Sequence, residues 1–198
     1  MIIITMTDSN PYRSIFLYGS RVYGTAREDS DKDFILIKED GEKEQYSHQM
    51  LMDVPYECTV YSIAEFQKLL DDHEISALEC YFLPEEFRLI DNALLSFTLD
   101  KAKLRHSLSK KSSNSWVKAK KKFEVEADRD IYVGKKSLFH SFRILDFGIQ
   151  IATTGKINDY GSQNSLYKEI MRNQSEDWED YYDSYKEKYN QLSTLFKK

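Results

Sequence analysis

The sequence of 198 residues contains only two cysteines, Cys58 and Cys80. Two cysteines cannot form a disulfide framework, and their spacing is not that of a metal site. Neither has an evident base partner in the sequence, which argues against thiol catalysis. This cysteine usage fits a reducing compartment, so we expect a cytoplasmic location.

Long apolar runs are also missing. No stretch approaches the roughly 20 apolar residues of a membrane-spanning helix, so we expect no membrane partner. Residues 1–6 are apolar, but this segment is far too short for a signal peptide. Ser20 lacks the Gly-x-Ser-x-Gly surroundings of a hydrolase nucleophile. We find no internal repeat and no low-complexity tract.

The length allows one domain, or a small domain with an appended lobe. Hydrophobic residues make up 41% of the chain and charged residues 31%, which is typical of a soluble globular protein with a core. The net charge of −5 argues against general polyanion binding by the whole chain.

The central feature is a small-residue turn between two apolar strands. The first strand, residues 14–18, leads into Gly19-Ser20, where a bare backbone can approach a ligand closely. The second strand, residues 33–37, is apolar throughout after its first residue, which predicts burial on both faces.

Alternating aspartates precede the second strand. Asp31 and Asp33 project to the same side because side chains alternate along a strand, and Asp29 joins them if the strand begins early. Two adjacent carboxylates suit Mg²⁺, which completes its shell with waters and substrate phosphates. The same residues are also compatible with a solvated turn.

Gly19-Ser20, followed by Asp31 and Asp33 ahead of an apolar strand, resembles the signature of the DNA polymerase beta-like nucleotidyltransferase superfamily. The longer string Gly-Ser-Arg-Val-Tyr-Gly-Thr-Ala, followed by Asp-Ser-Asp-Lys-Asp, is similar to one branch of bacterial and phage nucleotidyltransferases.

The resemblance implies an α+β fold, with a small mixed sheet and flanking helices in residues 1–98 and an α-helical lobe in residues 99–198. It also implies transfer of a nucleoside monophosphate from a nucleoside triphosphate, ATP or another, to an acceptor hydroxyl, with release of pyrophosphate. Two Mg²⁺ (or Mn²⁺) ions would serve this chemistry.

Glu57 is the candidate for a third carboxylate. It lies in a predicted strand, residues 54–61, and completes a cluster with Asp31 and Asp33 if the two strands are neighbours. The alternative is an exposed glutamate on an edge strand. The resembled family usually has Asp at the matching place, so Glu57 is a departure. Under the resemblance, the two aspartates bridge the ions, and Glu57 completes the site of the ion that activates the acceptor.

Gly19 and Ser20 would present backbone N–H groups and a hydroxyl to the triphosphate, as anion-binding nests do. Arg21 is close enough in sequence to reach a phosphate.

A basic block spans residues 101–122, which hold nine Lys and Arg residues and no Asp or Glu. Trp116 and His106 lie inside it. Basic residues with an interleaved aromatic suit a phosphate backbone and a stacked base, so we favour an RNA or tRNA acceptor. The alternatives are a solvated helix face or linker, and steering of the nucleoside triphosphate.

A long helix is predicted from about residue 135 to residue 154, closed by Gly155. Lys136, His140 and Arg143 fall on one face of it and can bind a triphosphate. An ordinary basic helix face is the alternative. The resembled branch has a Lys followed by His-x-x-Arg on a helix that a Gly ends.

The remaining segments predict structure rather than chemistry. Residues 38–49 are polar and predict a loop, and Ser62 with Glu65 forms a capping box that starts a helix. Apolar residues between positions 87 and 95 are expected in the core. Residues 178–195 predict an amphipathic helix that packs on the lobe or on a second subunit.

Two other functions fit the same residues. One is a nucleotide- or RNA-binding module without catalysis, which is supported by the basic block and the unusual Glu57. The other is a toxin-type enzyme that nucleotidylates a protein, and a small-molecule acceptor is a further variant. The sequence does not fix the acceptor, the base of the nucleotide or the oligomeric state.

Overall fold

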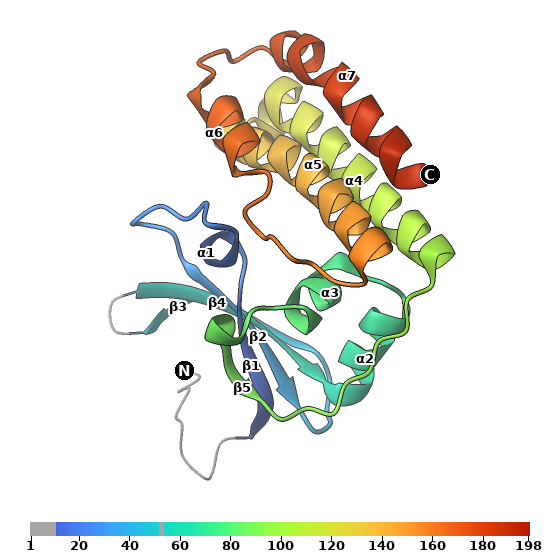
Figure 1. Ribbon diagram of the computed structural model, residues 1–198. Helices are drawn as coiled ribbons and strands as arrows, with labels where there is room; N and C mark the ends of the chain where they lie inside the picture. Colours follow the sequence, from blue (N-terminus) through green and yellow to red (C-terminus); the bar gives the residue numbers. More distant parts are fainter. Residues whose placement is uncertain (1–10, 52–53) are drawn as a thin grey trace. The chain divides into compact units, whose positions relative to one another are not determined.

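The structure is a computed structural model that describes residues 11–51 and 54–198. The chain divides into two compact units, Met1–Thr98 and Leu99–Lys198 (Figure 1). The apolar segment of residues 1–6 lies outside the described residues. The first unit combines a sheet with short helices, and residues 99–198 form helices without strands. The expected α+β class with a helical C-terminal region is therefore confirmed.

The first unit is built on a five-stranded sheet with the strand order β3-β4-β2-β1-β5. β2 and β4 are parallel and the other neighbouring pairs are antiparallel, so the sheet is mixed. The strands are β1 (Tyr12–Tyr18), β2 (Lys32–Lys38), β3 (Glu44–Leu51), β4 (Val54–Ser62) and β5 (Arg88–Asp91). The two strands of the central sequence motif, β1 and β2, are direct neighbours.

β2 lies in the middle of the sheet and is buried on both faces. Residues 34–37 are all buried, as their apolar run predicts. Phe16 of β1 pairs with Ile35 of β2, and the ring centroids of Phe16 and Phe66 lie 6.3 Å apart. Phe66 belongs to α2 (Ile63–Asp71), so α2 covers the face of β2 that carries Ile35. Side chains two residues along the strand from Ile35 project toward the same face.

The helices of the first unit are short: α1 (Ser20–Tyr23), α2, α3 (Ile75–Tyr81) and the 3-10 turn η1 (Glu85–Phe87). α2 begins at the predicted capping box. The backbone N–H of Glu65 donates to the Ser62 hydroxyl (3.2 Å), and the N–H of Ser62 donates to the Glu65 carboxylate (3.0 Å).

The prediction of a loop over residues 38–49 is wrong in its second half. β3 begins at Glu44 and pairs with β4 at the edge of the sheet. Its polar sequence is compatible with an edge strand because one side of such a strand can face water. Tyr46 is the exception, since it packs half-buried against the core of the sheet.

The expectation of core residues between positions 87 and 95 is wrong for Leu89 and Leu94. Leu89 is 42% exposed and Leu94 is 93% exposed. Leu89 lies on β5, a four-residue strand at the edge of the sheet, and Leu94 lies beyond its end. A short edge strand buries only alternate side chains, so the apolar residues around it do not all reach the core.

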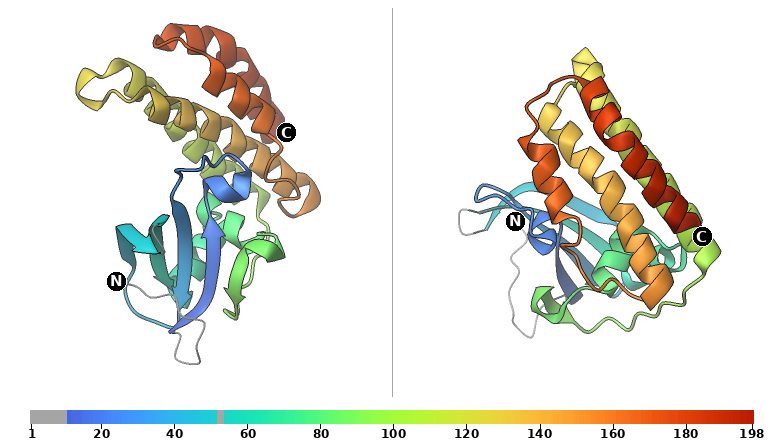
Figure 2. Two further views of the ribbon diagram at one scale, coloured as in Figure 1. Left: turned by 90° about the vertical axis from the view of Figure 1, so that its left-hand side faces the viewer. Right: turned by 45° about the horizontal axis from the view of Figure 1, so that its top comes forward.

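The second unit is helical and contains α4 (Lys101–Glu124), η2 (Glu126–Asp128), α5 (Ile131–Thr154), α6 (Asn164–Arg172) and α7 (Trp178–Lys197). α4 and α5 run side by side in opposite directions (Figure 2). The Ser112 hydroxyl donates to the Ser141 carbonyl (2.7 Å), and a Cβ at Gly134 would lie 2.6 Å from the ring of Phe123. The backbones of the two helices therefore approach closely.

α5 ends where the sequence predicts and begins earlier. Gly155 has a φ of 82°, and its N–H donates to the carbonyl of Ile151 (2.9 Å), which confirms its capping role. The helix starts at Ile131 because the Asp130 carboxylate caps it by accepting from the N–H of Val133 (2.9 Å).

The predicted amphipathic helix at the end of the chain is confirmed as α7, and it packs within its own unit. Trp178, Tyr181, Tyr185 and Tyr189 are buried. Trp116 of α4 lies against them, with its ring centroid 4.5 Å from that of Tyr189. Trp116 is 8% exposed, so the interpretation of this ring as a base-stacking side chain is wrong.

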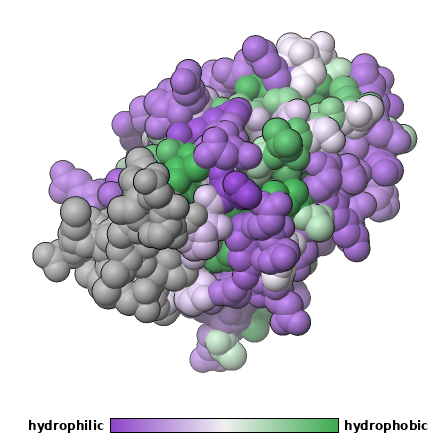
Figure 3. All heavy atoms as spheres, turned by 90° about the horizontal axis from the view of Figure 1, so that it is seen from below, coloured by the Kyte–Doolittle hydropathy of each residue, from purple (hydrophilic) through white to green (hydrophobic). Residues whose placement is uncertain are grey.

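The surface carries few large apolar side chains. Hydrophilic residues predominate on the side shown in Figure 3, where hydrophobic ones appear in small patches. The exposed large hydrophobic residues of the described part are Leu89, Leu94, Val117, Val125, Tyr132, Tyr182 and Leu195. Among the described helices, none has the length and apolar character needed to cross a bilayer.

Candidate active site

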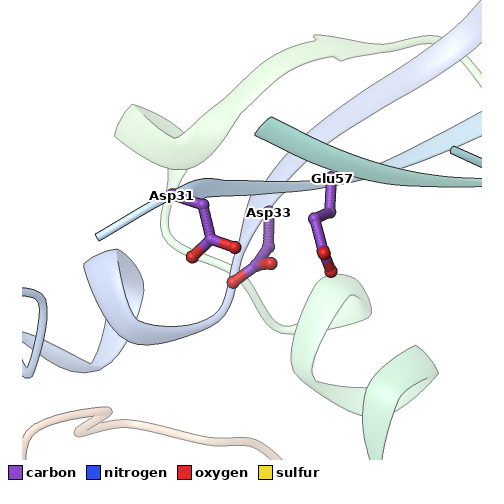
Figure 4. A group of neighbouring side chains, drawn as sticks. All are labelled: Asp31, Asp33 and Glu57. Atoms are coloured by element: carbon purple, nitrogen blue, oxygen red, sulfur yellow. The ribbon is translucent and has the colours of Figure 1, made fainter. Parts of the chain in front are cut away.

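Three carboxylates converge at one end of the parallel pair β2 and β4. One oxygen each from Asp31, Asp33 and Glu57 lie within 4.8 Å of one another (Figure 4). Asp33 pairs with Glu57 in the register of the two strands, and Asp31 immediately precedes β2. Paired residues of parallel strands project to the same face, and Asp31, one residue before β2, lies on the side of Asp33 as the alternation of a strand would place it. We call these three residues the carboxylate triad.

The third aspartate considered from the sequence, Asp29, lies outside the triad. Asp29 is exposed and accepts two hydrogen bonds from the guanidinium of Arg27 (3.0 and 2.8 Å). β2 begins at Lys32, so Asp29 belongs to the preceding turn and not to the strand. The condition that would have brought it into the cluster, an early start of the strand, is not met.

The triad has the chemistry of a divalent cation site. All three side chains are half-buried, and their oxygens are hard, anionic ligands of the kind Mg²⁺ and Mn²⁺ prefer. At a separation of 4.8 Å, each pair of charges repels by about 1 kcal/mol in water-like surroundings and about 3 kcal/mol at an effective dielectric constant near 20. A bound dication would turn this repulsion into attraction, so the residues present fit a metal.

Gly19 lies directly beside the triad. Its φ is 79°, and a Cβ at this position would lie 2.1 Å from Oδ2 of Asp33. Any side chain here would therefore collide with the carboxylate and would also strain the backbone. Glycine suits this position because it avoids both the strain of a positive φ and a Cβ that would displace the Asp33 carboxylate.

Ser20 and Arg21 open α1, next to Gly19. The carbonyl of Ser20 accepts from the N–H of Thr25 (2.9 Å), which closes the turn. The Arg21 guanidinium donates to the carbonyls of Ser30 (2.5 Å) and Asp31 (3.3 Å). Arg21 thus holds the loop that carries the first carboxylate of the triad, a role that its place in the sequence does not reveal.

The cations predicted on the long helix lie together on α5. Arg143 is 4% exposed, and its Nε–H donates to Nδ1 of His140 (3.2 Å). Burial lowers the pKa of His140 well below its ordinary value, and the charges of Arg143, Lys136 and Lys118 lower it further. His140 is therefore neutral at pH 7 and serves as a hydrogen-bond acceptor, so Lys136 and Arg143 supply the positive charge of this face.

Lys118 is the member of this group that sequence reasoning missed. It belongs to α4, where it was counted with the basic block, and the packing of α4 on α5 brings its charge near His140. The residue pattern within α4 or within α5 cannot predict which side chains of the other helix will be its neighbours.

The basic block forms an exposed surface along α4. Lys110 and Lys121 are 11 residues apart, about three helical turns, and Lys111 and Lys118 are 7 residues apart, about two turns. These four side chains are exposed. A cavity of about 490 Å³ lies beside them, lined by Asn114, Val117, Lys118, Lys121, Lys122 and Asp128.

Comparison with known proteins decides the family. Residues 6–105, just over half of the chain, match the family described as "Nucleotidyltransferase domain". The chain belongs to this family. The nucleotidyltransferase domain includes the whole carboxylate triad and the turn at Gly19, and it identifies the protein as a transferase of phosphorus-containing groups with a nucleoside triphosphate as substrate. A search among curated proteins found no match.

Proposed function

We propose that this nucleotidyltransferase uses the carboxylate triad to hold two Mg²⁺ (or Mn²⁺) ions. The observation that carries this proposal is the convergence of three carboxylate oxygens within 4.8 Å, beside a glycine that leaves no room for a Cβ. Bound there, the ions would neutralise the phosphoryl oxygens and favour ionisation of the acceptor hydroxyl. Asp31 and Asp33 would hold both ions, and Glu57 would complete the site of the ion that activates the acceptor.

The reaction is an in-line displacement at the α-phosphorus of the triphosphate. The acceptor hydroxyl loses its proton to water and its oxygen forms the new bond to the α-phosphorus. The bond from the α-phosphorus to the oxygen shared with the β-phosphate breaks, and pyrophosphate leaves. Gly19 and Ser20 are proposed to bind triphosphate oxygens through backbone N–H groups and the hydroxyl, with Arg21 fixing the loop beside them. These residues act by orientation and electrostatics, so they need to be preorganised rather than reactive.

The second unit is proposed to supply further anion-binding groups. Lys136 and Arg143 are cations on one face of α5, His140 offers a neutral imidazole beside them, and Lys118 adds a charge from α4. Arg143 is held in place by its hydrogen bond to His140 and by the ring of Phe147, whose centroid lies 5.0 Å from its guanidinium carbon. A cation fixed in this way loses little conformational entropy on binding a phosphate.

RNA, including tRNA ends, is the favoured acceptor. The support is the exposed lysine surface of α4, because regularly spaced lysines on one helix face can neutralise successive phosphates. The buried position of Trp116 removes one argument for base stacking and leaves the phosphate argument intact. A protein or small-molecule acceptor would not need this surface.

Pyrophosphate release tests the proposed function. The protein is incubated with each labelled nucleoside triphosphate, Mg²⁺ or Mn²⁺, and total RNA. We expect metal-dependent release and labelled RNA, and we expect the Asp31→Ala/Asp33→Ala double variant to lose both. Asp29→Ala is the matched control, since it removes a carboxylate from the same loop outside the triad and should keep full activity. Equal activity of wild type and double variant would overturn the proposal.

A further inference from the structure

A buried carboxylate that is not part of the triad lies on α3. Glu79 is 0% exposed, and Tyr23 at the end of α1 is 3% exposed. The Tyr23 hydroxyl donates a hydrogen bond to Oε2 of Glu79, with an oxygen–oxygen distance of 2.5 Å. A buried carboxylate is costly unless it accepts hydrogen bonds, and hydrogen bonds to charged acceptors are stronger than neutral ones. The Tyr23–Glu79 hydrogen bond therefore stabilises the packing of α1 against α3.

This hydrogen bond acts on the turn at Gly19 and Ser20, whose backbone is proposed to bind the triphosphate. Tyr23 is the last residue of α1, only four positions after Gly19, which lies against Asp33. Tyr18 pairs with Asp33 in the sheet, and its ring meets the ring of Tyr23 edge-on, with the centroids 6.3 Å apart. A shift of Tyr23 would move the turn against the carboxylate triad.

We propose that the Tyr23–Glu79 hydrogen bond is a positioning device for the turn at Gly19. It fixes the distance between the backbone groups that bind the triphosphate and the carboxylates that bind the ions. Neither residue is a ligand in this scheme, and both act through the turn. The inference rests on the proposed function for its effect on nucleotide binding, and on the fold alone for its effect on the turn.

The experiment compares Tyr23→Phe, Glu79→Gln and Glu79→Met with wild type. Tyr23→Phe and Glu79→Met remove the hydrogen bond, whereas the Glu79→Gln carbonyl can still accept it. Tyr46→Phe is the matched control, since it deletes another Tyr-to-Glu hydrogen bond in the same unit, on edge strand β3. The measurements are the affinity for Mn²⁺ alone, the affinity for Mn²⁺ with a non-hydrolysable triphosphate, and amide hydrogen exchange of residues 19–25.

We expect Tyr23→Phe and Glu79→Met to speed exchange of the amides of Val22 and Thr25, which donate to the carbonyls of Gly19 and Ser20. We expect triphosphate affinity to fall about 10- to 100-fold, as misplacement of a binding group predicts, with Mn²⁺ affinity unchanged. Glu79→Gln should recover most of both losses, and Tyr46→Phe should show neither.

Two results would overturn the inference. One is unchanged exchange at residues 19–25 in Tyr23→Phe, and the other is faster exchange with unchanged triphosphate affinity. Both differ from failure of the proposed function, in which the wild type itself would bind no triphosphate with metal.

Discussion

The two units of the chain collect charge of opposite sign by different means. In the first unit, three carboxylates meet because β2 and β4 pair in parallel with Asp33 opposite Glu57. In the second unit, cations meet because α4 and α5 lie side by side, each with its own basic face. The first site depends on strand register, and the second on the packing of helix surfaces.

The difference has a physical consequence for tolerance to change. A register shift of one residue would send every side chain of a strand to the other face, so the carboxylate triad is either complete or absent. A helix surface offers neighbouring lysines at several spacings, so loss of one cation leaves others nearby. We therefore expect sharp effects of substitution in the first unit and graded effects in the second.

The largest effect should come from Glu57→Ala, which removes the carboxylate that pairs with Asp33 across the two strands. We expect nucleotidyl transfer to fall at least about 100-fold, equivalent to about 2.7 kcal/mol in the barrier. Glu57→Asp, which keeps a carboxylate on a shorter side chain, should keep activity within about tenfold of wild type, since it retains the ligand type.

The matched control is Thr59→Ala, two residues along the same face of β4, and it should have little effect. The measurement is the initial rate of pyrophosphate release. If Glu57→Ala lowers the initial rate no more than Thr59→Ala does, the proposed contrast between the two units is wrong.

The next effect concerns Gly19. Gly19→Ala combines a strained φ with a Cβ 2.1 Å from Asp33, so we expect loss of activity and a fall of about 1–3 kcal/mol in the free energy of unfolding. Gly155→Ala separates the two causes, because its φ is 82° and nothing lies within 4 Å of its Cβ.

Gly155→Ala should lower stability by about 1 kcal/mol and leave activity unchanged. Chemical denaturation and the transfer assay measure both properties in each variant. Equal activity of Gly19→Ala and Gly155→Ala would show that the close approach of Gly19 to Asp33 does not affect catalysis.

A smaller, graded effect is expected on the lysine surface of α4. The triple variant Lys110→Gln/Lys111→Gln/Lys121→Gln should weaken RNA binding. It should also lower the slope of log affinity against log salt by about 1 for each phosphate that a lysine no longer neutralises. Each single variant should give about a third of the change. Filter binding at several salt concentrations measures the slopes.

The control changes the net charge by the same amount elsewhere in the second unit, with Lys168, Lys197 and Lys198 replaced by Gln. These residues are exposed and lie off the α4 surface. Equal loss of RNA affinity in both triple variants would show that only total charge matters and would remove the support for a defined docking surface.

The smallest effect is the pH dependence of the stability of the second unit. The pKa of His140 is lowered in the folded state by burial and by nearby cations, so the unfolded state binds its proton more readily. Stability should therefore fall as the pH drops below about 6.5, by at most about 1.4 kcal/mol per pH unit, and be fully present above that value.

Tryptophan fluorescence can follow this change, because Trp116 and Trp178 are the only tryptophans and both lie in the second unit. His140→Gln should flatten the dependence between pH 5 and pH 7, about the range in which free histidine titrates. His106→Gln, an exposed position on α4, should preserve it.

Local patterns in the sequence predicted much of the fold. The apolar run of β2, the capping box at Ser62, the glycine that ends α5 and the amphipathic α7 were all readable because each signal lies within a few residues. β3 was not readable, since its polar sequence becomes a strand only by pairing with β4. Leu94 was misjudged because its exposure depends on where a four-residue strand stops.

The sequence by itself determined that Asp31 and Asp33 share one side, because alternation is a property of a single strand. It also determined that the turn before them carries a glycine at position 19. Only the tertiary structure decided that Glu57 joins them, that Asp29 does not, and that a Cβ at position 19 would collide with the Asp33 carboxylate. Those facts depend on which strands become neighbours, and pairing between distant segments leaves no mark in the local sequence.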